Sequence, residues 1–277
     1  MILYDFERLN VRCYRFTGIS TGEISQEYES QMSTKLLSTS MDYIRFTVVI
    51  VVLILEAIAA LTGITNPWFL SASVAIVILA FINYIDVRSQ EWSRYALLFL
   101  VAMICGSIGD FLMADIFRIT SIPVLNGIIL FGIGHIFYLL GLRDRSYLLL
   151  RPSGINQPRL ITKNLVTWLV VCALVILLFV ASVFNPTMLE LGFGMLGYGL
   201  LLGTVLAFAV TKWFDEFPSS FKFCVSIGFL LFLFSDWLIG VHLMTDPGFL
   251  SGPYVGLTYI FGQLLIQLST MFGAKGT

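Results

Sequence analysis

Residues 95–115 read YALLFLVAMICGSIGDFLMAD, an apolar run with one aspartate, Asp110, in its interior. A helix needs about 20 apolar residues to span about 30 Å of hydrocarbon, and this run is long enough. Residues 221–243 form a second such run, in which Asp236 follows Ser235 directly. An ionised carboxylate at the centre of a spanning helix costs about 2.5 to 3.5 kcal/mol, so a chain that keeps one usually has a use for it. The two aspartates are the first candidates for a functional site.

The composition of the whole chain indicates a polytopic membrane protein. Of the 277 residues, 58% are hydrophobic and only 12% are charged, which is too apolar for an ordinary soluble domain. Eight apolar runs approach the length of a spanning helix: 43–62, 67–85, 95–115, 123–142, 163–184, 188–210, 221–243 and 251–271. We therefore predict an all-α fold with eight transmembrane helices in a membrane domain over residues 43–277. Charged residues interrupt residues 1–42, which we interpret as a cytosolic N-terminal arm without a signal peptide.

The distribution of basic residues predicts the orientation of the chain. Counted across eight spans, all but one of the 16 Lys and Arg residues lie on the side of the N-terminus, and only Arg118 lies on the other side. By the positive-inside rule, both termini are then cytoplasmic. A basic inner loop, 143–162, joins two sets of four spans, 43–142 and 163–271, whose equal orientation permits a parallel 4+4 repeat. The net charge of −1 gives no reason to expect nucleic acid as a partner.

Counting along the helices places several polar side chains at related depths. With a rise of about 1.5 Å per residue, both aspartates lie about 22 Å from the cytoplasmic ends of their spans. Glu56 and Tyr259 come out near the same level. Gln263 and His135 lie roughly 6 to 10 Å deeper. If the helices bring these side chains together, they form a polar pocket in the outer half of the membrane.

Each candidate also has a purely structural interpretation. A buried carboxylate such as Asp110 can serve only to fix the packing of helices. A lone intramembrane histidine such as His135 is often a packing residue, and Tyr138, on the same helical face, fits an interfacial anchor equally well. Glu56 has no motif around it. Because His135 and His242 are the only histidines, a three-histidine zinc site is excluded, and we expect neither a metal nor another cofactor.

Four short motifs occur in order along the chain. They are GD at 109–110, GIGHIFY at 132–138, SD at 235–236 and YIFGQ at 259–263. In order and spacing they resemble the YhhN-type lysoplasmalogenase family of multi-span membrane proteins. The resemblance covers roughly residues 95–142 and 221–271. A Lys-Pro pair that family members carry near the start of an early helix has no counterpart before Asp110 in this sequence.

The resemblance implies hydrolysis of the vinyl-ether bond of a lysoplasmalogen, which releases a fatty aldehyde and a glycerophospho-base. The two aspartates suit this chemistry: a protonated carboxyl delivers a proton to the β-carbon of the enol ether, and an ionised one directs water to the α-carbon. Either aspartate fits either role. The lysophospholipid would reach the pocket sideways from the bilayer. The candidates for substrate binding are His135, Tyr138, Tyr259, Gln263, Glu56 and Ser235.

Two other functions fit the same acids. The first is a transporter in which Glu56, Asp110 and Asp236 relay protons or bind a cation. The second is a two-aspartate intramembrane protease, which the sequence supports less because the tyrosine-aspartate motif of that class is missing. An integral membrane hydrolase of this kind belongs in the plasma membrane of a prokaryote or the endoplasmic reticulum of a eukaryote.

Overall fold

The computed structural model describes residues 21–62, 66–117, 123–149, 157–245 and 253–275, and the secondary structure in these ranges is helical, without strands. The chain divides into two compact units, Met1–Ile44 and Arg45–Thr277. Residues 1–20 of the predicted arm lie outside the described residues. From Thr21 the chain is helical, and the part of this helix from Arg45 onward belongs to the second unit, which holds the candidate site.

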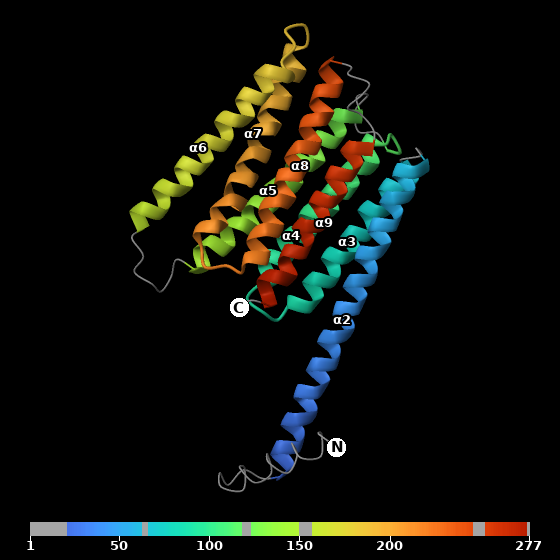
Figure 1. Cartoon of the computed structure of the whole chain (residues 1–277), viewed down its shortest axis with the longest axis vertical. Coiled ribbons are helices and arrows are strands. Elements are labelled where there is room, and N and C mark those ends of the chain that lie inside the picture. The colour runs from blue at the N-terminus through green and yellow to red at the C-terminus, as the bar shows by residue number, and fades with distance from the viewer. Residues whose placement is uncertain (1–20, 63–65, 118–122, 150–156, 246–252, 276–277) are drawn as a thin grey trace. The chain divides into compact units, whose positions relative to one another are not determined.

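Eight helices within the described residues are long and apolar enough to cross a membrane, as predicted. The helices (Figure 1) are α2 (Thr21–Thr62), α3 (Asn66–Val87), α4 (Ser93–Met113), α5 (Pro123–Leu149), α6 (Gln157–Ser182), α7 (Leu189–Thr211), α8 (Ser219–Thr245) and α9 (Pro253–Lys275). A short 3-10 helix, η1 (Lys212–Phe214), follows α7. The predicted loop 143–162 is too long, because α5 and α6 both continue into it. Charged residues end an apolar run without ending a helix, since Arg and Gln are good helix formers. The cytoplasmic termini and the 4+4 repeat stay predictions.

The site lies where two closely packed helix pairs, α4 with α5 and α8 with α9, contact their neighbours. Glycines permit this close approach. A Cβ on Gly134 of α5 would lie 2.9 Å from the main-chain oxygen of Ala102 in α4. A Cβ on Gly262 of α9 would lie 2.9 Å from the main-chain oxygen of Gly228 in α8. Small residues at such crossings bring the polar side chains of different helices within hydrogen-bonding distance.

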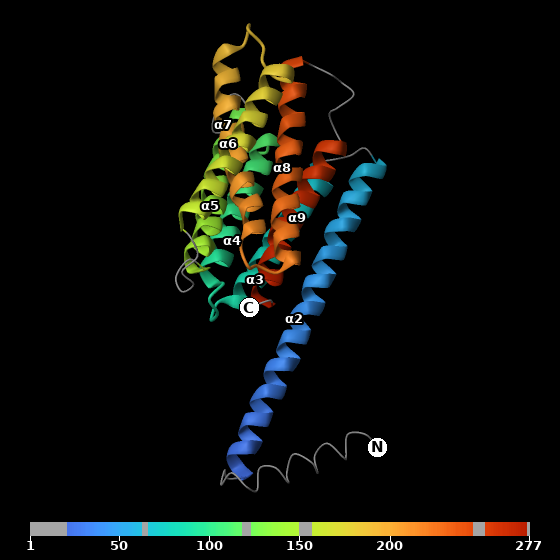
Figure 2. The same ribbon diagram turned by 60° about the vertical axis from the view of Figure 1, so that its left-hand side comes forward.

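The rest of the bundle is an apolar frame around these pairs. At the end where α3 joins α4, the rings of Trp92, Tyr95 and Phe221 pack against one another, with Trp92 and Phe221 5.2 Å apart between centroids. Helix α6 packs on α7 (Figure 2). Most of the other apolar side chains of α6 are exposed. Such a surface is typical of a helix that faces lipid.

Candidate functional site

Asp110 of α4 is buried and held by two hydroxyl donors from other helices. Ser73 of α3 donates to Oδ2 at 2.5 Å, and Tyr259 of α9 donates to the same oxygen at 3.0 Å. Only 3% of Asp110 is exposed. Because a carboxyl oxygen has two lone pairs, these donors occupy Oδ2, and a proton on this carboxyl would sit on Oδ1. The protein therefore anchors Oδ2 of Asp110 and leaves Oδ1 available for another partner.

Two glycines on α4 make room for this arrangement. A Cβ on Gly106, one turn before Asp110, would lie 3.5 Å from the Tyr259 hydroxyl and 3.7 Å from Nε2 of Gln263. A Cβ on Gly109 would lie 3.0 Å from the ring of Phe131 in α5. The small face of α4 thus admits the polar side chains of α9 on one side and an aromatic ring on another. This explains why Asp110 follows small residues in the sequence.

Asp236 of α8 has different surroundings. Its Oδ2 accepts a hydrogen bond from Tyr198 of α7 at 2.5 Å. Both residues line a cavity of about 100 Å³ that is bounded by α5, α6, α7 and α8 and also reached by Met113 of α4. Its other walls are apolar and include Val175, Phe179, Val183, Met195, Leu202 and Leu233. Asp236 is thus a carboxyl on the wall of a hydrocarbon-lined space.

His135 of α5 packs beside Tyr198, the hydroxyl donor to Asp236. Its Nδ1 is 2.6 Å from the main-chain oxygen of Phe131, which can only accept, so Nδ1 carries the hydrogen. In the neutral ring, Nε2 is then an acceptor, and it has no hydrogen-bond partner among the described residues. The ring centroid is 5.7 Å from that of Tyr198 and 4.8 Å from that of Phe232. Phe232 in turn contacts Tyr259, with centroids 5.1 Å apart. The His135 ring therefore contacts the partner of Asp236 directly and the partner of Asp110 through Phe232.

Each of the two aspartates has its own hydroxyl donors. Phe131 joins their surroundings, since it lines the cavity and its ring lies 6.1 Å from the ring of Tyr259. The site thus contains one carboxyl in a polar setting, one on an apolar cavity, and an imidazole acceptor beside Tyr198.

A comparison with protein families identifies the family of this chain. The model of the YhhN family matches residues 67–270, from the start of α3 almost to the end of α9. The chain belongs to the YhhN family. The resemblance seen in the sequence is confirmed, and the matched region includes Asp110, His135 and Asp236. No match was found among curated proteins or among solved structures.

Two more predicted residues of this YhhN-family chain meet beside Asp110. Tyr138 of α5 donates a hydrogen bond to Oε1 of Gln263 in α9 at 2.8 Å. The two side chains are each 1% exposed. A place at the membrane surface, the alternative interpretation of Tyr138, does not fit its burial. Gln263 and Tyr259 lie one turn apart on α9, so the predicted group of Tyr138, Gln263 and Tyr259 does assemble around Asp110.

Two predicted residues are not brought into this group. Ser235 is fully buried, and its hydroxyl donates to the main-chain oxygen of Val255 in α9 at 3.1 Å. Glu56 of α2 is 4% exposed, and its Oε1 is 3.1 Å from the position of a Cβ on Gly256. Its Oε2 has no hydrogen-bond partner within the part of the chain that the structure describes. Glu56 also precedes the residues matched by the YhhN family model.

Sequence reasoning missed three residues of the candidate site, Ser73, Tyr198 and Gln267. Ser73 carries no signal, because single serines are common in spanning helices. Tyr198 lies between two glycines inside an apolar run, which is a weak signal because tyrosine and glycine are both common in spanning helices. Gln267 follows Gln263 by one helical turn and so shares its face. In the described ranges, no three His, Cys, Asp or Glu side chains lie close enough together to hold a metal ion.

Proposed function

We propose that this protein hydrolyses the vinyl-ether bond of lysoplasmalogens inside the membrane and releases a fatty aldehyde and a glycerophospho-base. The observation that carries the proposal is the position of Asp236, whose carboxyl lies on the wall of an apolar cavity. A second carboxyl, Asp110, is held by polar donors, and one of these, Tyr259, contacts Phe131 of the cavity wall. Hydration of an enol ether needs an acid beside a hydrocarbon chain and a base beside water. Membership of the YhhN family is consistent with this activity.

The surroundings of the two acids favour one assignment of roles. In a vinyl ether, the carbon that takes the proton is the β-carbon, which lies one bond further along the hydrocarbon chain than the α-carbon. If the chain occupies the apolar cavity, the β-carbon lies nearer to Asp236, which we assign as the acid. Asp110 then faces the α-carbon and the oxygen, and we assign it as the base that directs water and stabilises the oxocarbenium ion.

The reaction returns both acids to their starting states. The proton of Asp236 forms a C–H bond with the electron pair of the double bond, and the ether oxygen stabilises the resulting cation. Water adds to the α-carbon as Asp110 takes its proton, which gives a hemiacetal. The hemiacetal hydroxyl then returns a proton to Asp236 while the bond to the glycerol oxygen breaks, and that oxygen takes the proton from Asp110. One water is consumed, and an aldehyde and an alcohol are formed.

His135 suits the binding of the reacting water in this scheme. Its Nε2 lone pair is buried without a partner among the described residues, in a ring that packs beside Tyr198, and an O–H donor bound there would complete the hydrogen bonding of the ring. A buried acceptor without a partner costs about 1–3 kcal/mol, so a water or a glycerol hydroxyl bound there is stabilised. The lipid would reach the cavity sideways from the bilayer, since α6, which forms one wall of the cavity, exposes apolar side chains on its outer face.

The test is aldehyde release from a lysoplasmenyl-ethanolamine by the purified protein, alongside Asp110→Asn and Asp236→Asn. We expect activity in the native protein and a loss of at least about 100-fold in each variant, the usual contribution of a general acid or base. Glu190→Gln, which alters an exposed acid in the first turn of α7, is the control and keeps full activity. Full activity in either aspartate variant, or no aldehyde from the native protein, contradicts the proposal.

Isotopes test the chemistry itself. In D₂O the product aldehyde, trapped as it forms, carries one deuterium on the carbon next to the carbonyl, because the β-carbon takes a solvent-derived proton. In water labelled with ¹⁸O, the glycerophospho-base carries no label, because water attacks the α-carbon. A saturated 1-O-alkyl lysolipid has no double bond to protonate and is not cleaved. Label in the glycerol product would instead indicate attack on the glycerol carbon.

A further inference from the structure

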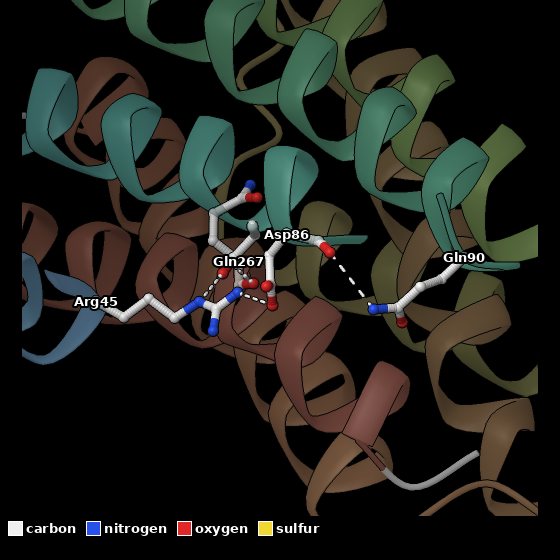
Figure 3. Close-up of polar contacts among 5 residues, drawn as sticks. Arg45, Asp86, Gln90 and Gln267 are labelled. Carbon is white, nitrogen blue, oxygen red and sulfur yellow. Dashed lines mark hydrogen bonds and ion pairs between the residues drawn. The ribbon is translucent and has the colours of Figure 1, made fainter. Parts of the chain in front are cut away.

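A chain of buried hydrogen bonds begins at α2 and ends beside Asp110. Arg45 is 3% exposed, and its Nε donates to Oδ1 of Asn83 in α3 at 2.8 Å. Its Nη2 donates to Asp86 at 2.5 Å, as Figure 3 shows together with the bond from Gln90 to the main chain of Asp86. Asn83 extends these hydrogen bonds to α9, because its Nδ2 donates to the main-chain oxygen of Gln267 at 2.9 Å.

The side chain of Gln267 continues the chain toward the site. Its Nε2 donates to the hydroxyl of Tyr138 at 2.9 Å and to the main-chain oxygen of Phe99 at 3.5 Å. The Tyr138 hydroxyl donates in turn to Oε1 of Gln263. Asn83 thus links α3 to the main chain of α9, and Gln267, Tyr138 and Gln263 link α9 to α5 through side chains; all four side chains are buried.

The amides of Asn83 and Gln267 are each oriented by a neighbour that can act in only one way. A guanidinium only donates, so Arg45 must meet the oxygen of Asn83 and leave its nitrogen for Gln267. A main-chain carbonyl only accepts, so the oxygen of Phe99 must meet the nitrogen of Gln267. The hydroxyl oxygen of Tyr138 accepts a hydrogen bond from Nε2 of Gln267, and the hydroxyl hydrogen is donated to Oε1 of Gln263.

The consequence is a fixed orientation of the Gln263 amide. Because its oxygen accepts from Tyr138, its nitrogen faces the other way, toward Gly106 of α4. The Gln263 nitrogen and the Tyr259 hydroxyl lie 3.7 Å and 3.5 Å from the same point, the position of a Cβ on Gly106. The amide therefore presents N–H donors next to the hydroxyl that holds Asp110.

We propose that Tyr138 and Gln267 are positioning residues that hold the Gln263 amide with its nitrogen toward the substrate, where it donates a hydrogen bond to an oxygen of the lysolipid's glycerol unit. This inference rests on the proposed hydrolysis. Without the hydroxyl of Tyr138, the amide is free to turn its oxygen toward the glycerol oxygen, where two acceptors would face each other. The hydrogen bond holds ground state and transition state alike, so its loss raises KM and leaves kcat nearly unchanged.

The experiment is a double-mutant cycle of Tyr138→Phe and Gln263→Leu. Each single variant should raise KM about 3- to 10-fold, the range for one lost hydrogen bond. The double variant should be no worse than Gln263→Leu, because Tyr138 acts through Gln263. The matched control is Tyr95→Phe, which removes a buried tyrosine hydroxyl that is 2.9 Å from Ser269 of α9 and outside the chain. It should lower the melting temperature without changing KM. Gln267→Met, expected to raise KM in the same way, replaces Tyr138→Phe if that variant fails to fold.

A binding measurement keeps this test independent of turnover. A saturated 1-O-alkyl lysophosphoethanolamine, which has no bond to cleave, should raise the melting temperature of the native protein and of Tyr95→Phe more than that of Tyr138→Phe or Gln263→Leu. If the native protein releases no aldehyde, the proposed hydrolysis fails and this measurement alone decides the inference. Three results overturn the inference. They are additive effects of the two substitutions on KM, a change of KM in Tyr95→Phe, and equal stabilisation of the native protein and Gln263→Leu by the alkyl lipid. Absence of any stabilisation also overturns it.

Discussion

Filling the cavity beside Asp236 should abolish most of the affinity for the hydrocarbon chain. Gly199 of α7 lines this cavity, and a Cβ on it would lie 3.5 Å from Val175, an ordinary contact distance. Gly199→Leu therefore introduces four carbon atoms, and the first of these, Cβ, fits without pushing α6 and α7 apart. An apolar cavity of about 150 Å³ holds a benzene, so the cavity of about 100 Å³ holds about four carbons. The substitution should thus fill the space.

The size of the effect follows from the burial of those carbons. Each buried methylene contributes about 0.8 kcal/mol, so the loss of four costs about 3 kcal/mol, or up to roughly 150-fold in affinity. The chain is bound equally before and during the reaction, so KM should rise while kcat changes little. The assay is the rate of aldehyde release against the concentration of a long-chain lysoplasmenyl lipid.

Gly197→Leu is the matched control for this prediction. It places the same side chain two residues away on the same helix, at an exposed glycine with nothing within 4 Å of its Cβ position, and should leave KM unchanged. A second control uses a two-carbon vinyl ether of the same head group, which has no chain to place. On this substrate Gly199→Leu and the native protein should have equal kcat/KM. A native KM in Gly199→Leu, or an equal rise in Gly197→Leu, would refute the assignment of the cavity to the chain.

Three further predictions follow from the same geometry. Ser73→Ala and Tyr259→Phe each leave Asp110 with a single hydroxyl donor. Each should lower kcat at least about 10-fold, since a hydrogen bond to a charged group contributes about 1.5–3 kcal/mol. Steady-state kinetics of aldehyde release measures kcat, and an unchanged kcat in both variants contradicts the prediction. Gly262→Ala places a Cβ 2.9 Å from a main-chain oxygen of α8 and should destabilise the fold by about 1–3 kcal/mol. Gly194→Ala meets nothing within 4 Å and should be neutral or slightly stabilising. Thermal unfolding in detergent compares the two variants, and equal melting temperatures would contradict this prediction. Sealed vesicles that contain the native protein should take up neither protons nor cations in response to an imposed gradient, as a pH-sensitive dye reports; uptake that Asp110→Asn abolishes would favour the transporter.

The spanning helices could be predicted from the sequence because hydrocarbon thickness fixes their length. Apolar runs of about 20 residues have few alternatives in a membrane, and all eight agree with the helices found. The loop 143–162 was predicted too long for a related reason, since hydropathy locates the membrane surface and a helix such as α5 continues beyond it. Length and hydropathy therefore predict where the chain crosses the membrane better than where its helices end.

Only part of the site could be predicted from the sequence. Counting residues predicts the depth of a side chain in the membrane, but not the rotation of its helix about its axis. Counting residues placed Tyr259 at the level of Asp110, and the two are hydrogen-bonded. Counting says nothing about which helices are neighbours or how each is turned about its axis, and these decide that Ser73 and Tyr198 are the other donors. Serine and tyrosine are ordinary residues in spanning helices, so a single sequence gave neither of them a distinguishing signal of comparable weight to a buried aspartate.

The hydrogen-bond chain between Arg45 and Gln263 also bears on the choice between hydrolase and transporter. A proton relay needs groups that accept a proton on one side as they release one on the other, as carboxyls, imidazoles and waters do. Asparagine and glutamine amides do not do so readily, and Asn83 and Gln267 occupy the middle of this chain. Arg45 holds the amide of Asn83 in one orientation, and the main-chain oxygen of Phe99 holds that of Gln267. Such fixed amides favour a positioning role over a proton relay. A fixed donor beside Asp110 is of little use to an ion that passes through, whereas a substrate that must present one particular carbon to an acid requires it.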